Sequence, residues 1–174
     1  MEKRSQWKVA MTYGAMYGLA SSIIYLIFYF AGADIENKGP QLIGYLIMIA
    51  TIYIGITNYR NNDLGGFISY GKSLGTGVLI GLFGGIITGF FTVIMFTVID
   101  PGLAQKIIEK AQEDMVEKGT MSEEQINAAI SLTQKFMNPV ALFLFSILGS
   151  VFMAFIFSLI VSIFTKKEPS PFQG

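Results

Sequence analysis

Four long stretches of this chain are apolar and contain no charged residue. They cover residues 9–31, 41–58, 73–99 and 139–165. A helix rises about 1.5 Å per residue, so each stretch is long enough to cross a hydrocarbon core about 30 Å thick, although the second is near the minimum length. Only 14% of the residues are charged, well below the fraction in a soluble domain. The sequence therefore predicts an all-α membrane protein whose four transmembrane helices form one domain over residues 1–174.

Three of these stretches carry small residues at every fourth position, which places each row on one face of its helix. In lipid, a row without bulky side chains lets a neighbouring helix approach to backbone contact. We therefore predict that the rows are helix-packing seams. The residues are Gly14, Gly18 and Ser22 in the first stretch, Gly77, Gly81, Gly85 and Gly89 in the third, and Ser146, Ser150, Ala154, Ser158 and Ser162 in the fourth.

The segment between the third and fourth stretches, about 101–137, has the pattern of two amphipathic helices. Asp100-Pro101 is a helix-start signal, Gly119 is a stop signal, and Ser122 to Gln125 forms a capping box. We expect an amphipathic helical hairpin that docks on the bilayer surface or on a partner protein. Its candidate docking residues are Leu103, Ile107, Ile108, Ile126 and Ile130.

The distribution of Lys and Arg predicts the orientation of the spans. The N-terminal segment has three of these residues, and the loop over residues 58–72 and the C-terminal tail have two each, whereas the first loop has only Lys38. The segment over residues 100–138 has four lysines, but these stand against seven acidic residues. By the positive-inside rule, both termini are cytoplasmic and the hairpin is extracytoplasmic. The alternative for the first stretch is a cleaved signal peptide ending at Ala31-Gly32-Ala33, but its apolar run is longer than such peptides have.

The composition excludes several classes of chemistry. The chain has no Cys and no His, which removes disulfides, thiolate or imidazole metal sites and His-based acid–base catalysis. Its net charge is zero, so we expect no nucleic-acid partner. Two weaker hypotheses are a Ca²⁺ site at Glu109, Glu113, Asp114 and Glu117, and a phosphate cradle at Gly65-Gly66. A solvated face explains the first better and a surface turn explains the second better, so we expect no catalytic, cofactor or metal site.

The loop that reads NYRNNDLGGFISYGK, residues 58–72, resembles a known family. Together with Trp7-Lys8 near the N-terminus, the acidic insert and Asn138-Pro139 before the last span, it is similar to the bacterial integral-membrane family catalogued as domain of unknown function 4199. The resemblance implies four spans and an inner-membrane location. Because that family has no established activity, it assigns no residue a role.

Two functional hypotheses follow from these features. The first is a non-enzymatic accessory, scaffold or assembly factor whose hairpin binds a membrane-protein partner. The second is an oligomeric channel or facilitator, in which the Gly77–Gly89 face lines a pore or contacts another copy of the chain. No charged residue lies inside a predicted span, which argues against a proton-coupled transporter. An enzyme is disfavoured, because the loops contain no recognisable acid–base pair.

Overall fold

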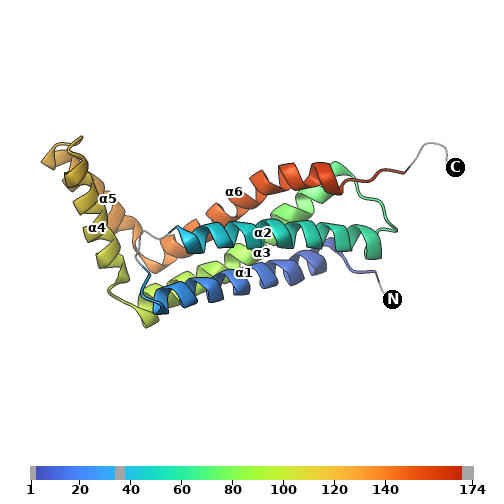
Figure 1. Ribbon diagram of the computed structural model, residues 1–174, viewed down its shortest axis with the longest axis horizontal. Coiled ribbons are helices and arrows are strands. Elements are labelled where there is room, and N and C mark those ends of the chain that lie inside the picture. Colours follow the sequence, from blue (N-terminus) through green and yellow to red (C-terminus); the bar gives the residue numbers. More distant parts are fainter. Residues whose placement is uncertain (1–2, 34–37, 170–174) are drawn as a thin grey trace. The chain divides into compact units, whose positions relative to one another are not determined.

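The computed structural model describes residues 3–33 and 38–169, and these are organised as helices joined by turns (Figure 1). The helices are α1 (Gln6–Phe30), α2 (Gly39–Asn58), α3 (Tyr70–Ile94), α4 (Leu103–Lys118), α5 (Glu123–Phe136) and α6 (Pro139–Thr165). Short π-helical turns extend α2 over Tyr59–Asp63 and α3 over Met95–Ile99. The expected polar turn at residues 34–37 and the end of the tail, residues 170–174, lie outside the described residues.

Four of these helices are long and apolar enough to cross a membrane, as the sequence predicted. They are α1, α2 with its π-helical turn, α3 with its π-helical turn, and α6. The second and third are longer than expected, because the helical backbone continues through Tyr59–Asp63 and begins at Tyr70 rather than Ser73. The first begins at Gln6 because the Ser5 hydroxyl caps it, accepting from the backbone N–H of Lys8.

The contacts divide the chain into two compact units. The first comprises the described residues of 1–88 and 146–174, and therefore holds α1, α2, most of α3 and most of α6 (Figure 1). The second comprises residues 89–145, with α4, α5 and the adjoining ends of α3 and α6.

In the first unit, α3 is the central helix because it packs against the other three. Its Ile80 is fully buried and contacts α2 at the position where Gly55 leaves room for it. The core around Ile80 includes Ile52 and Ile56 of α2 and Tyr13 of α1. The first unit is therefore held together by apolar and small side chains that converge on α3.

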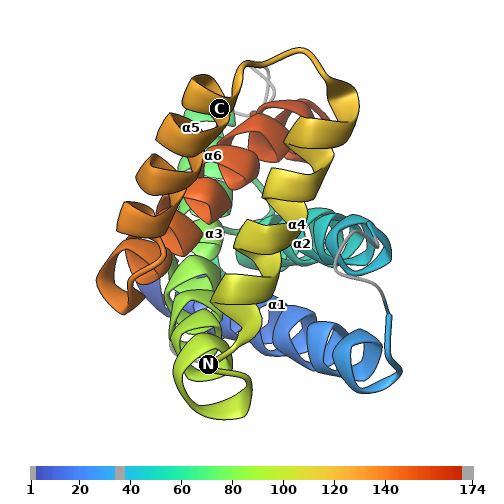
Figure 2. The same cartoon turned by 90° about the vertical axis from the view of Figure 1, so that its left-hand side faces the viewer.

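The second unit contains the helical pair α4 and α5, which Figure 2 shows running side by side in opposite directions. Ile108 of α4 packs with Ile126 and Ile130 of α5, and all three side chains are buried. Ser122 and Gln125 form the predicted capping box, and Gly119 ends α4 with a φ of 61°. The predicted start of α4 was wrong: Asp100 ends the preceding π-helical turn and accepts from the N–H of Gly102, so α4 begins at Leu103.

Candidate functional site

The glycine row of α3 lies against the small-residue row of α6. A methyl group added at Gly77 would collide with Ser158 Oγ, and one added at Gly81 would collide with Ala154 Cβ. At Gly85 the added Cβ would lie 2.8 Å from Ser150 Cβ, shorter than real Cβ contacts. Because each step of four along α3 is matched by a step of four backwards along α6, the two helices are antiparallel and share one seam. We call these six residues the α3–α6 seam.

The α3–α6 seam also contains an interhelical hydrogen bond. The Ser150 hydroxyl donates to the backbone carbonyl of Gly81 at 2.8 Å, and both groups are buried. A carbonyl within a helix is accessible to a neighbour only if that neighbour can approach the backbone, which the glycines permit. The pairing of small residues ends at Gly89. An added Cβ there would lie 2.9 Å from the ring of Phe143 rather than against Ser146, which is half-buried.

This packing bears directly on the channel hypothesis. Gly77, Gly81 and Gly85 have no free space beside them, because residues of α6 occupy it. A pore lined by this face would require α6 to move away and expose the carbonyl of Gly81. The contacts within the chain therefore favour a packed seam.

The small residues of α1 lie against a second face of α3. An added Cβ at Gly14 would lie 2.6 Å from Phe83 Cβ, and one at Gly18 would lie 2.7 Å from Ile87 Cβ. Ser22 is buried and donates to the carbonyl of Gly18 in its own helix. On α3, the matching position is Gly84, which makes room for the Tyr17 ring.

A cluster of polar side chains joins the start of α1 to the end of α2. The Arg4 guanidinium donates to Asp63 Oδ2 at 2.9 Å and also to Asn58 Oδ1, and the backbone N–H of Arg4 donates to Asp63 Oδ1 at 2.8 Å. Asp63 is only 5% exposed. A buried carboxylate is costly unless it is paired and hydrogen-bonded, and Arg4 supplies both interactions.

The π-helical turn after α2, the loop that follows it and the first turn of α3 are all bonded to the end of α6. Arg60 donates to the carbonyl of Thr165 at 2.8 Å, and the hydroxyls of Ser73 and Thr165 are 2.6 Å apart. Ile68 and Lys167 exchange two backbone hydrogen bonds of 2.9 Å in an antiparallel bridge. The loop can turn back because Gly65 and Gly66 have φ values of 70° and 92°, which residues with side chains rarely adopt. The segment NYRNNDLGGFISYGK therefore connects α1, α2, α3 and α6 at one end of the first unit.

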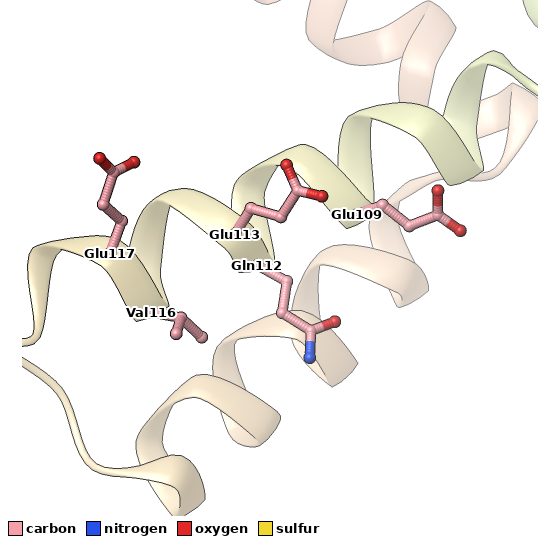
Figure 3. A pocket seen from close by; sticks show the side chains of 5 residues that line it. All are labelled: Glu109, Gln112, Glu113, Val116 and Glu117. Carbon is pink, nitrogen blue, oxygen red and sulfur yellow. The ribbon is translucent and has the colours of Figure 1, made fainter.

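A shallow groove runs along the exposed side of α4 (Figure 3). Figure 3 shows Glu113 and Glu117 on one side of the ribbon, and Gln112 and Val116 on the other. Val116 is 61% exposed. Lys110 lies 3.6 Å from Asp114 and 3.9 Å from Glu113, so part of the acidic charge is balanced within the helix. Among the described residues, no group of three acidic side chains is placed to hold a metal ion.

Residues 12–167 match the model of a family described as protein of unknown function, DUF4199. The chain belongs to the DUF4199 family. The matched range includes the loop that carries the resemblance, both hairpin helices and nearly all of the four candidate spans. No curated protein and no solved structure matches the chain.

In this DUF4199 chain, three of the five expected docking residues, Ile108, Ile126 and Ile130, pack between α4 and α5. Leu103, Ile108, Ile126 and Ile130 are between 3% and 9% exposed, and Ile107 is half-buried. The docking role predicted for these five residues stays a prediction, and the exposed surface of the hairpin is formed mainly by other side chains. The physical reason is that two amphipathic helices joined by a short connection bury their apolar sides against each other first.

Several residues that organise this DUF4199 chain were not singled out from the sequence. Gly84 was not identified because it is next to Gly85, which belongs to the row at every fourth position. A Gly-Gly pair could have indicated it, because two adjacent glycines lie on different faces of a helix. Gly55 is an isolated glycine without a repeat to reveal it. The pairing of Arg4 with Asp63 joins residues 59 positions apart, and no local pattern predicts it.

Proposed function

We propose that this DUF4199 protein is a non-enzymatic accessory protein of the bacterial inner membrane that holds a partner membrane protein through its hairpin. The observation that carries the proposal is the construction of the hairpin. Its apolar side chains are packed between α4 and α5, while the groove of α4 presents carboxylates and the exposed Val116. Such a surface suits recognition of another protein, with one apolar anchor surrounded by charges that set specificity.

The charge of the groove favours a basic protein segment over the bilayer as the occupant. Glu109, Glu113 and Glu117 follow one another along α4 and line the groove. Bacterial phospholipid surfaces that carry negative charge repel carboxylates, whereas Lys and Arg side chains of a protein attract them. We therefore propose that the partner presents an apolar side chain to Val116, flanked by basic residues.

The docking surface is tested by placing a photocrosslinker on a cysteine introduced as Val116→Cys, which is unique because the chain has no natural cysteine. We expect a discrete adduct with one membrane protein whose crosslinked peptide contains Lys or Arg. Reversing two groove charges, Glu113→Lys with Glu117→Lys, should abolish this adduct. The matched control is Glu123→Lys with Glu124→Lys, which makes the same change of charge at the start of α5 and should preserve it. An adduct that survives charge reversal in the groove would contradict the proposal.

The orientation we propose places both termini in the cytoplasm and the hairpin outside. It is supported by the Lys and Arg content of the N-terminal segment, the α2–α3 loop and the tail. Thr120→Cys, in the exposed connection between α4 and α5, should react with an impermeant thiol reagent in intact spheroplasts. Asn61→Cys, which is also exposed, should react only after permeabilisation. The opposite labelling pattern would reverse the orientation.

A further inference from the structure

We propose that the end of the first unit where α1 begins and α6 ends is a binding surface for anionic phospholipid headgroups. We call this surface the basic end and define it by its exposed lysines, Lys3, Lys8, Lys72, Lys166 and Lys167. It lies in the first unit, whereas the hairpin groove is in the second, so this inference does not depend on the proposed docking function.

The charges of the chain are distributed unequally among its segments. Residues 1–8, 58–72 and 166–174 contain seven Lys and Arg residues and three acidic residues, whereas the remaining segments contain five lysines and nine acidic residues. The zero net charge of the chain therefore conceals an excess of four positive charges in the first group. A surface with such an excess attracts anions locally, even when the whole protein is neutral.

The structure gathers these three segments at one place. Arg4 binds Asp63, Arg60 binds the carbonyl of Thr165, and Lys167 pairs with Ile68 through two backbone hydrogen bonds. The lysines therefore belong to a connected structural element rather than to independent tails. Their positive charges are brought together even though they come from three separate parts of the sequence.

One acidic residue of these segments, Asp63, is not available to neutralise the lysines. Asp63 is buried and its charge is already compensated by Arg4. Among the described residues of the three segments, the remaining carboxylate is that of Glu168, which is exposed. The Arg4–Asp63 ion pair thus removes an acidic group from the surface while it holds the loop in place.

Two of the lysines contact aromatic rings. Lys72 Nζ lies 5.6 Å from the centroid of the Tyr59 ring, and Lys167 Nζ lies 5.8 Å from that of Phe67. These cation–π contacts hold the ammonium groups near rings of the type that membrane proteins place at the headgroup level. Trp7, which is 55% exposed, follows Gln6, whose side chain donates to Thr76 and to the carbonyl of Lys72. Trp7 is adjacent in sequence to Lys8, and its ring packs edge-on against Phe83 of α3, with 5.8 Å between the ring centroids.

This placement provides a spectroscopic probe, because Trp7 is the single tryptophan of the chain. The full-length protein is reconstituted with phosphatidylglycerol or phosphatidylcholine that carries bromine on the upper part of the acyl chains, which quenches a nearby tryptophan. We expect the quenching of Trp7 to show about a fivefold preference for brominated phosphatidylglycerol over the choline lipid, since that ratio corresponds to the attraction of one lysine to an anionic lipid surface. Raising the salt concentration should reduce the preference.

The variant Lys3→Gln, Lys8→Gln, Lys72→Gln should lose most of this preference. The control variant Lys106→Gln, Lys110→Gln, Lys118→Gln makes the same change of charge in the hairpin and should retain it. Equal quenching by both lipids, or a preference that survives the first variant, would overturn the proposal. Soluble glycerol phosphate separates a lipid from a free phosphate as the ligand: it should leave the quenching unchanged, and full competition by it would contradict a lipid site.

Discussion

At the scale of single residues, α3 can pack closely against α6 because glycines of α3 have no side chain at the contact. Gly81 provides the clearest case, because a Cβ there would occupy the position of Ala154 Cβ. We predict that Gly81→Ala lowers the free energy of unfolding by about 1–3 kcal/mol, as overpacked sites do. The measurement is thermal or denaturant unfolding of the protein in lipid–detergent micelles.

A compensating substitution distinguishes this collision from other effects of Gly81→Ala. Adding Ala154→Gly removes the atom that the new methyl group meets, so the double variant should recover most of the lost stability. Gly149→Ala, at an exposed position of α6 with open space beside it, is the control and should change little. If the double variant were as unstable as the sum of the two single variants, Gly81 and Ala154 would not be in contact.

A second effect of single residues is the ion pair between Asp63 and Arg4, which holds the start of α1 to the end of α2. Asp63→Asn keeps the size of the side chain but leaves Arg4 without its charge partner, so we expect a loss of about 1–3 kcal/mol, since hydrogen bonds to charged groups have this magnitude. Glu113→Gln breaks a pair between exposed groups and should cost well under 1 kcal/mol. Equal effects of the two substitutions on unfolding would mean that the Arg4–Asp63 pair does not hold the loop.

At the scale of elements, the hairpin is organised by local signals. Ser122 and Gln125 satisfy each other's backbone N–H groups at the start of α5. Ser122→Ala should destabilise this end of the helix by about 0.5–2 kcal/mol. The effect should appear as faster amide hydrogen exchange over Glu124 to Ile126, whereas Ser131→Ala, at an exposed position inside α5, should not produce it. Unchanged exchange in the Ser122 variant would show that tertiary contacts alone fix this helix start.

The same elements show what could be predicted from the sequence. The capping box, the stop at Gly119 and the four apolar spans were predictable, because each is encoded within a few turns of one helix. The predicted start of α4 was wrong, since Asp-Pro can also end a π-helical turn. The packing of Ile108 on Ile126 and the Arg4–Asp63 pair required the tertiary structure, because their partners are distant in sequence or belong to another helix.

At the scale of the whole molecule, we expect α3 and α6 to pack through small residues when the protein is in a membrane. α6 is 27 residues long and most of its apolar surface is exposed, which suits a helix that meets lipid on its other sides. Its buried side chains include most of the small-residue row: Ser150, Ala154, Ser158 and Ser162 are between 0% and 8% exposed, and Val161 and Thr165 are also buried. The sides of α6 are thus divided between a narrow packing row and a lipid-facing surface.

The most direct test is disulfide formation in native membranes between Gly85→Cys and Ser150→Cys, introduced together into this Cys-free chain. Their Cβ atoms would be 2.8 Å apart, so a small shift brings them to the roughly 3.8 Å that a disulfide requires. We predict rapid intramolecular crosslinking under mild oxidation, and little crosslinking when Gly85→Cys is combined with Gly149→Cys, one position further around α6. Absence of the first crosslink, or equal crosslinking of both pairs, would contradict the α3–α6 seam.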